Sequence, residues 1–157
     1  MLIRPYLPGE EALLRAIFHA SVHGIAQRDY TPEQLRAWAP VHYDVALWNQ
    51  RMRANQALVA ELDGQPAAFA DLQPSGYIDM FFVAPAYTRR GVGSALLRHI
   101  FQAAAARGIG ELFSDVSLTA EAFFRHHGFI VETRNEVAVR GEVLANASMR
   151  KLLAAPA

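Results

Sequence analysis

The segment of residues 78–107 constrains the fold more than any other stretch of the chain. Residues 78–83 read IDMFFV and are apolar apart from Asp79, which is typical of a strand covered on both faces. A loop then leads into a run with helical periodicity, where apolar side chains recur at Val92, Leu96 and Ile100. The alanines at 103–106 favour continued helix. A buried strand that passes into an amphipathic helix predicts an α/β fold.

The turn at residues 88–94 has the features of an anion-binding site. The first turn of a helix carries unpaired backbone N–H groups and a partial positive charge. Gly91 and Gly93 lack a Cβ, so a phosphate can approach the peptide planes closely. The glycine pair alone is equally compatible with a closely packed helix start. Because Arg89 and Arg90 add positive charge and a strand precedes them, we expect an anion site.

Two common phosphate-binding motifs do not match this turn. A Walker loop requires Gly-Lys-Ser/Thr, and a dinucleotide fingerprint requires a third glycine where this chain has Leu96. The segment TRRGVG at residues 88–93 instead resembles the coenzyme A site of the GNAT superfamily of N-acetyltransferases, Gln/Arg-x-x-Gly-x-Gly/Ala between a strand and a helix. Thr88 stands where the superfamily usually has Gln or Arg. This departure removes one side-chain contact and leaves the backbone donors in place.

Composition narrows the class of protein further. A chain of 157 residues is most simply one domain, and the absence of cysteine excludes a disulfide framework, a thiolate metal site and a cysteine nucleophile. The 15 basic and 15 acidic residues give a formal charge of zero and are spread along the chain, which argues against nucleic acid as a partner. No signal-peptide pattern and no membrane-spanning apolar run is present, so we expect a cytoplasmic protein without membrane contact.

The remaining sequence predicts alternating strands and helices around the segment at 78–107. Expected strands span residues 2–6, 57–62, 66–72, 78–83, 111–116, 130–140 and 142–151. Expected helices span residues 10–24, 32–39, 44–54, 92–107 and 119–127. Leu13, Leu14, Ile17 and Phe18 are expected on the buried face of the first helix. Hairpin turns are expected at Asp63-Gly64 and Arg140-Gly141. This order favours an α/β sandwich with a mixed sheet.

A second motif strengthens the resemblance to the GNAT superfamily. Residues 120–129 read AEAFFRHHGF, which agrees at four of the five specified positions with Ala-x-x-Phe-Tyr-x-x-x-Gly-Phe. The resemblance covers nearly the whole chain, which looks most like an uncharacterised bacterial branch. It implies a single N-acetyltransferase domain over residues 1–157. The fold implied is a mixed, mostly antiparallel central sheet of about seven strands flanked by helices, with a splay between strands 4 and 5.

The same resemblance implies acetyl-CoA as cosubstrate and assigns residues to it. The turn binds the pyrophosphate through Thr88, Arg89, Arg90, Gly91, Val92, Gly93 and Ser94. The backbone of Phe81, Phe82 and Val83 pairs with the pantetheine arm as an added strand would, and one of its N–H groups polarises the thioester carbonyl. Phe123 and Phe124, from the second motif, complete the cradle. The pantetheine arm is expected in the cleft between residues 80–83 and 112–116.

The base that accepts the proton of the acceptor amine is expected to be Asp79. It is the only charge in the apolar strand, and burial beside Met80 and Phe81 would raise its pKa towards a useful range. The alternative is that Asp79 lies where the strand frays and bonds a backbone amide. Glu61 and Asp71 are weaker candidates, both expected to be solvated charges at strand ends.

The acid that protonates the leaving thiolate is less obvious from the sequence. Many GNAT members use the tyrosine of the Phe-Tyr pair, and this chain has Phe124 there, which cannot donate a proton. Ser117 is the first candidate because it follows the fifth strand; Tyr77, Tyr87 and a water are alternatives. A thiolate with a pKa near about 8.5 can also leave without full protonation.

The acceptor pocket is expected under the helices that follow the first strand. His23, Tyr30, Trp38, His42, Tyr43 and Trp48 gather there, and we expect one or two of them to contact substrate and the rest to pack; His23, Tyr30 and Trp38 are the candidates. His126 and His127 are expected to stabilise a helix end. No spacing of His, Asp and Glu suggests a metal.

These patterns lead to two hypotheses about function. The first is direct transfer of an acetyl group from acetyl-CoA to a primary amine of a small molecule, peptide or protein, in a ternary complex. The second is a non-catalytic acyl-CoA-binding or regulatory module, which Phe124 favours. The sequence leaves the acceptor, the acyl-chain preference and homodimer formation open.

Overall fold

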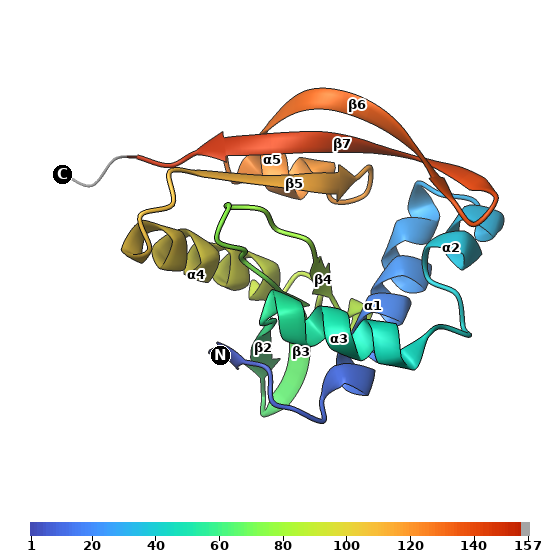
Figure 1. Ribbon diagram of the computed structural model, residues 1–157, viewed down its shortest axis with the longest axis horizontal. Helices are drawn as coiled ribbons and strands as arrows, with labels where there is room; N and C mark the ends of the chain where they lie inside the picture. Colours follow the sequence, from blue (N-terminus) through green and yellow to red (C-terminus); the bar gives the residue numbers. More distant parts are fainter. Residues whose placement is uncertain (155–157) are drawn as a thin grey trace.

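Seven strands form two antiparallel sheets in the computed structural model, which describes residues 1–154 (Figure 1). The first sheet has the order β1-β2-β3-β4, with β1 Leu2–Pro5, β2 Leu58–Leu62, β3 Gln65–Ala70 and β4 Phe81–Val83. The second has the order β5-β7-β6, with β5 Glu111–Ser117, β6 Ile130–Val139 and β7 Glu142–Leu152. The predicted α/β class and strand count are confirmed, with the strands divided between two sheets.

The helices are α1 Glu11–Ile25, η1 Ala26–Arg28, α2 Pro32–Trp38, α3 Val45–Asn55, η2 Pro85–Tyr87, α4 Val92–Ala106 and α5 Glu121–His126. Two of the helices, α2 and α3, begin at residues whose side chains cap them. Thr31 and Gln34 form a reciprocal capping box at α2, with Pro32 at its first position. Asp44 caps α3 by accepting the N–H of Leu47 at 3.0 Å. The helix predictions are therefore confirmed to within a few residues.

Two tight turns set the register of the hairpins. Asp63 and Gly64 have φ of 55° and 76°, and Arg140 and Gly141 have φ of 43° and 86°. Two consecutive residues with positive φ are the geometry of a type I′ turn, which matches the twist of the flanking strands. Both predicted hairpins are confirmed, and the second one carries Arg140 towards α2.

The four-stranded sheet is covered by helices on both faces (Figure 1). Alternate residues of β2 and β3 belong to different apolar clusters: Ala60 and Ala68 lie with α4, whereas Val59 and Phe69 lie with α1. One prediction for α1 is wrong. Leu13 was expected on its buried face but is 42% exposed, so the packed face consists of Leu14, Ile17, Phe18 and Val22.

The two sheets diverge between β4 and β5. Just before β4, Tyr77 forms a parallel bridge with Phe113, and the N–H of Ile78 donates to the carbonyl of Phe113 at 2.9 Å. The hydroxyl of Ser114 donates to the carbonyl of Ile78 at 2.7 Å. Beyond this point β4 pairs with β3 and β5 pairs with β7. The predicted splay between strands 4 and 5 is confirmed.

The predicted strand at 78–83 is too long, because β4 begins only at Phe81. The side chain of Asp71 accepts the N–H groups of Asp79 and Met80 at 3.1 and 2.6 Å, in the place of a backbone carbonyl of β3. Met80 still accepts the N–H of Asp71 at 3.2 Å, so the strands stay together. A carboxylate inserted into the ladder thus accounts for the irregular start of β4.

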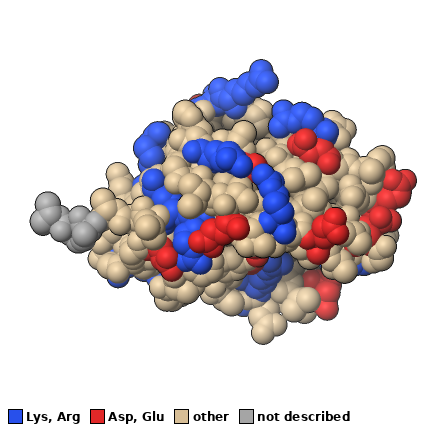
Figure 2. Space-filling model, turned by 90° about the horizontal axis from the view of Figure 1, so that it is seen from above, with Lys and Arg blue, Asp and Glu red and all other residues tan. Residues whose placement is uncertain are grey.

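The face above β6 and β7 carries interspersed positive and negative side chains (Figure 2). Two arginines on these strands are ion-paired: Arg150 of β7 contacts Glu111 and Glu132, and Arg134 of β6 contacts Glu121. This face therefore presents no patch of a single charge. Throughout residues 1–154, every helix is too short or too polar to span a bilayer.

Candidate active site

The turn that joins η2 to α4 leaves a group of N–H donors unpaired. Gly91 caps α4 with a φ of 78°, and Arg89 also has a positive φ of 62°. The first helical hydrogen bond runs from the N–H of Ala95 to the carbonyl of Gly91, at 3.0 Å. The N–H groups of the first turn, between those two residues, have no partner within the helix. Unpaired N–H groups and the positive end of the helix dipole are the features that favour an anion at this turn.

The two glycines have different structural roles. A Cβ on Gly93 would lie 3.4 Å from the ring of Phe123 and 3.5 Å from a methyl group of Val83, so Gly93 lets α4 start close to β4 and α5. A Cβ on Gly91 would meet nothing within 4 Å. Gly91 is required by its positive φ and borders open space in which a phosphate can lie.

A cavity of about 330 Å³ extends from this turn along β4 to α5. Every predicted coenzyme A residue except Arg90 lines it: Phe81, Phe82, Val83, Thr88, Arg89, Gly91, Val92, Gly93, Ser94, Phe123 and Phe124. The side chain of Arg90 instead points to the β2–β3 hairpin, where it pairs with Asp63 at 3.0 Å. The structure thus brings the two motifs around one cavity but places Arg90 outside it.

The outer edge of β4 is open towards this cavity. Ala84 donates to Ala67 and Met80 accepts from Asp71, so the even-numbered residues bond to β3. Because backbone groups alternate in direction along a strand, the N–H and C=O groups of Phe81 and Val83 point the other way. β4 is the edge strand of its sheet, so these groups are free to pair with an amide-containing ligand.

A second cavity, also of about 330 Å³, adjoins the first. Trp38, Phe82 and Ser117 line both cavities. The lining of the second is mixed, with aromatic, basic and acidic side chains: Phe18, Tyr30, Trp48, Arg15, Arg51, Arg140, Asp79 and Asp115. The two cavities are therefore adjacent and share the walls that Trp38, Phe82 and Ser117 form.

Two of the three predicted acceptor residues line this second cavity. Trp38 packs against Tyr30, with ring centroids 5.5 Å apart. The hydroxyl of Tyr30 donates to the carbonyl of Ala145 at 2.6 Å and accepts the N–H of Leu118 at 3.0 Å, so it ties the helices to β7. His23 lies outside both linings, because its ring bonds to the carbonyl of Ala39 at 2.8 Å.

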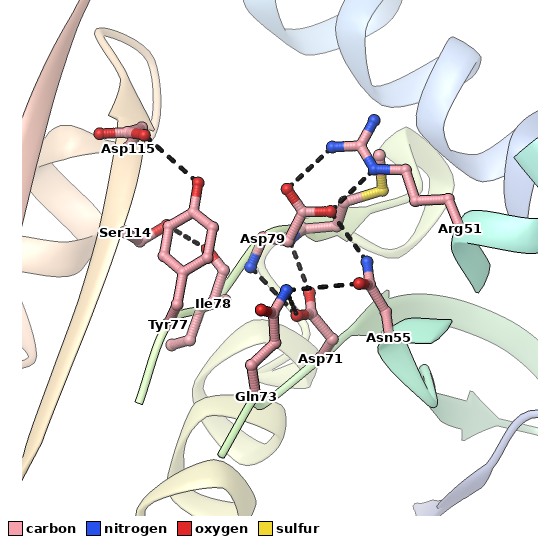
Figure 3. A network of polar contacts seen from close by, with 10 residues as sticks. Arg51, Asn55, Asp71, Gln73, Tyr77, Ile78, Asp79, Ser114 and Asp115 are labelled. Carbon is pink, nitrogen blue, oxygen red and sulfur yellow. Dashed lines mark hydrogen bonds and ion pairs between the residues drawn. The ribbon is translucent and has the colours of Figure 1, made fainter. Parts of the chain in front are cut away.

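Asp79 projects into the second cavity as half of an ion pair (Figure 3). Arg51 donates to both of its carboxylate oxygens at 2.8 Å, and Asn55 donates at 2.8 Å. Burial favours a raised pKa, but the hydrogen bonds from Arg51 and Asn55 outweigh it and lower the pKa of Asp79 below its usual value. The expectation of a raised pKa for Asp79 is therefore wrong.

The carboxyl group with a raised pKa is that of Asp71, which lies next to Asp79 in the same network (Figure 3). Asp71 is 1% exposed, and burial raises its pKa to about 6 despite the N–H groups that it accepts. The prediction of a solvated Asp71 is thus wrong. Glu61 accepts a hydrogen bond from Arg4 at 2.9 Å on β2 and lines neither cavity.

Ser117 lies where the two cavities meet. Its hydroxyl oxygen accepts the N–H of Ala120 at 3.1 Å, which leaves its proton free to donate. Phe124 is 2% exposed and packs against Phe81 and Phe129. Tyr77 is an unfavourable donor, since burial and Asp115 raise its pKa to about 12.

Comparison with known proteins identifies the family. A family model described as an acetyltransferase (GNAT) domain matches residues 26–153. The chain belongs to the GNAT acetyltransferases. The uncharacterized N-acetyltransferase YafP of Escherichia coli K12 is 39% identical over 148 residues, which cover 94% of this chain and 93% of that protein.

Solved structures of GNAT proteins share the fold over almost the whole chain. A GCN5-related N-acetyltransferase from Rhodopseudomonas palustris matches with a TM-score of 0.92 and 40% identity, over 97% of this chain and 95% of that one. PaiA N-acetyltransferase from Thermoplasma acidophilum, in complex with coenzyme A, matches with a TM-score of 0.74 and 20% identity over 96% and 98%. At that identity the likeness shows the fold alone.

This GNAT site also contains residues that sequence reasoning missed. Arg51 and Asn55 lie four residues apart on α3 and share a face, and that spacing could have indicated a common partner. Arg15 and Arg140 lie 125 positions apart in the sequence, so no local pattern joins them. Within the described part of the chain, no group of three or more His, Asp or Glu side chains is arranged to hold a metal ion.

Proposed function

We propose that this GNAT protein transfers an acetyl group from acetyl-CoA to a primary amine by direct attack in a ternary complex. The observation that carries the proposal is that two adjacent cavities share Ser117, Trp38 and Phe82 in their walls. One cavity has an anion site and an open strand edge, and the other has charged and aromatic walls. Two substrates bound in this way would react without a covalent enzyme intermediate.

The first cavity would hold the cosubstrate through backbone groups. The pyrophosphate binds the N–H groups at the start of α4, and Arg89 adds charge. The pantetheine amides pair with the free edge of β4 as an additional strand. A free N–H of Phe81 or Val83 then polarises the thioester carbonyl, stabilising the oxyanion that forms on attack.

Asp79 would orient the amine of the acceptor rather than act as the general base that keeps its proton. An amine with a pKa near about 10.4 is mostly protonated at neutral pH, so it must lose a proton before attack. Because the pKa of Asp79 is lowered, its carboxylate attracts the ammonium group but holds a proton only briefly. The amine proton therefore passes to water. Coenzyme A leaves as a thiolate, which the hydroxyl of Ser117 stabilises by a hydrogen bond and which takes its proton from water, because Phe124 stands where many GNAT members have the tyrosine acid.

Release of free thiol from acetyl-CoA in the presence of a panel of primary amines tests the proposal. We expect thiol release above the rate without amine, and none from a Gly91→Glu variant that lacks the phosphate site. Tight coenzyme A binding with no amine-dependent release would contradict the enzyme hypothesis and support the non-catalytic module that Phe124 favours.

A further inference from the structure

Arg15 is a buried cation without a carboxylate partner. It is 9% exposed, on α1, and lines the second cavity. One N–H donates to the carbonyl of Pro40 at 2.8 Å, and the guanidinium lies 4.1 Å from the ring centre of Tyr43. In residues 1–154 no acidic group lies within 4.0 Å of it. Arginine is rarely buried without an anionic partner, so this position indicates a missing one.

A second arginine faces the same cavity. Arg140 lies in the β6–β7 turn and donates to the carbonyl of Ala37 at 2.7 Å. It too lacks an ion pair among the residues that the structure describes. Burial lowers the pKa of Arg15, and the charge of Arg140 lowers it further, against an opposite contribution from Tyr43. Two arginines that repel each other in one cavity would both be stabilised by a shared anion.

The acidic groups of the cavity do not neutralise this pair. Asp79 is engaged by Arg51, and Asp115 accepts hydrogen bonds from Tyr77 and Ser148. Asp44, which lines a neighbouring cavity beside both arginines, is the N-cap of α3. Three arginines and two aspartates line the second cavity, so its side chains carry one excess positive charge, and neither Arg15 nor Arg140 forms an ion pair with Asp79 or Asp115.

We propose that the acceptor is a small molecule that carries an oxyanion, a carboxylate or a phosphonate, as well as its primary amine. The oxyanion lies between Arg15 and Arg140, and the amine faces Asp79 and Ser117. Paired guanidinium groups recognise such oxyanions through two parallel hydrogen bonds. The volume of about 330 Å³ suits an amino-acid-sized molecule. This inference rests on the proposed acetyl transfer.

The test compares acceptors that differ only in the oxyanion. The probes are glycine, alanine, leucine and phenylalanine, their carboxamides, and the corresponding 1-aminoalkylphosphonic acids. We expect at least one acid to be acetylated with a kcat/KM about tenfold or more above that of its amide. The amine of an amino-acid amide loses its proton more readily than that of the free acid. Intrinsic reactivity therefore favours the amides, and a preference for the acids cannot be explained by it. The phosphonates show which oxyanion the site prefers.

Variants connect the preference to the two arginines. Arg15→Gln and Arg140→Gln are each expected to reduce the acid-to-amide ratio about tenfold, mainly through KM. Arg36→Gln is the matched control, since it removes one exposed charge of α2 outside both cavities. Arg15→Gln could unfold the protein, because its contact with Pro40 is lost. In that case the acid-to-amide ratios of Arg140→Gln and Arg140→Lys still show whether an arginine at this cavity recognises the oxyanion. Unchanged coenzyme A affinity shows that a variant is folded.

A binding measurement separates failure of this inference from failure of the proposed function. The chain has two tryptophans, Trp38 and Trp48, and both line the second cavity. Their fluorescence should change when an acid probe is added to the coenzyme A complex, and respond more weakly to its amide. This response without any acetylation would support the oxyanion site and contradict acetyl transfer. The inference is overturned if the fluorescence responds equally to acids and amides, or if it responds to no acid. It is also overturned if the preference for acids over amides is unchanged in both arginine variants.

Discussion

The Asp71→Asn substitution is expected to stabilise the protein at neutral pH, although Asp71 is buried and accepts two backbone N–H groups. The side chain is 1% exposed, and burial raises its pKa to about 6. An aspartate in an unfolded chain titrates near about 3.9, so folding raises the pKa by about 2 units. At about 1.36 kcal/mol per unit, the ionised form of Asp71 costs the folded protein about 3 kcal/mol.

The sign of the pH dependence follows from the direction of this shift. Between about pH 4 and pH 6 the folded protein keeps the proton of Asp71 and the unfolded chain has lost it. The contribution of this group to the free energy of unfolding is therefore fully present below about pH 4 and is lost as the pH rises through about 6. Asparagine resembles the protonated acid in shape and does not titrate, so the variant lacks this loss.

Urea unfolding at several pH values from about 4 to about 7 measures the effect. Relative to the parent, the variant should gain about 3 kcal/mol of stability between the lowest and the highest pH, because only the parent titrates, whereas the cost of an amide that accepts only one of the two N–H groups does not change with pH. Asp63→Asn, at an exposed turn position, is the control and should show no comparable trend. A difference that stays constant with pH, or that favours the parent at neutral pH, would show that the hydrogen bonds from Asp79 and Met80 outweigh burial.

Five further substitutions test the two cavities. Gly91→Glu should abolish coenzyme A binding in calorimetry without unfolding the protein, whereas Gly91→Asn, which tolerates positive φ, should keep measurable affinity. Arg89→Gln should weaken coenzyme A binding about tenfold and Arg90→Gln less than about twofold, and the reverse order would place the wrong arginine at the phosphate. Asp79→Asn should lower kcat with coenzyme A affinity unchanged; an equal rate at every pH would remove Asp79 from the mechanism.

Much of the fold could be predicted because its signals are local. The hairpin turns at residues 63–64 and 140–141 and the helical periodicity of Val92, Leu96 and Ile100 depend on neighbouring positions, and the structure confirms them. The two glycines of the anion turn are also a local signal, and the turn lies where the sequence placed it. The divergence of strands β4 and β5 was predicted only from the resemblance to the GNAT superfamily, because no single segment of the sequence indicates it.

The errors concern residues whose environment is set by distant parts of the chain. Asp79 was expected to have a raised pKa because its neighbours are apolar, but Arg51 and Asn55 come from a helix that precedes it by more than twenty positions. Asp71 was expected in solvent because strand ends are often exposed, yet it replaces a carbonyl inside the sheet. Contacts between side chains that lie far apart in the sequence cannot be predicted from the spacing of residues along the chain.

The open edge of β4 affects more than cosubstrate binding. An unpaired strand edge can add a strand from another chain as readily as it can add a pantetheine arm, so the empty protein has a route to self-association. β4 has 3 residues, which limits how much of a foreign strand can pair with it. Bound coenzyme A would occupy the same backbone groups. The cosubstrate would then make this edge unavailable to a strand from another chain.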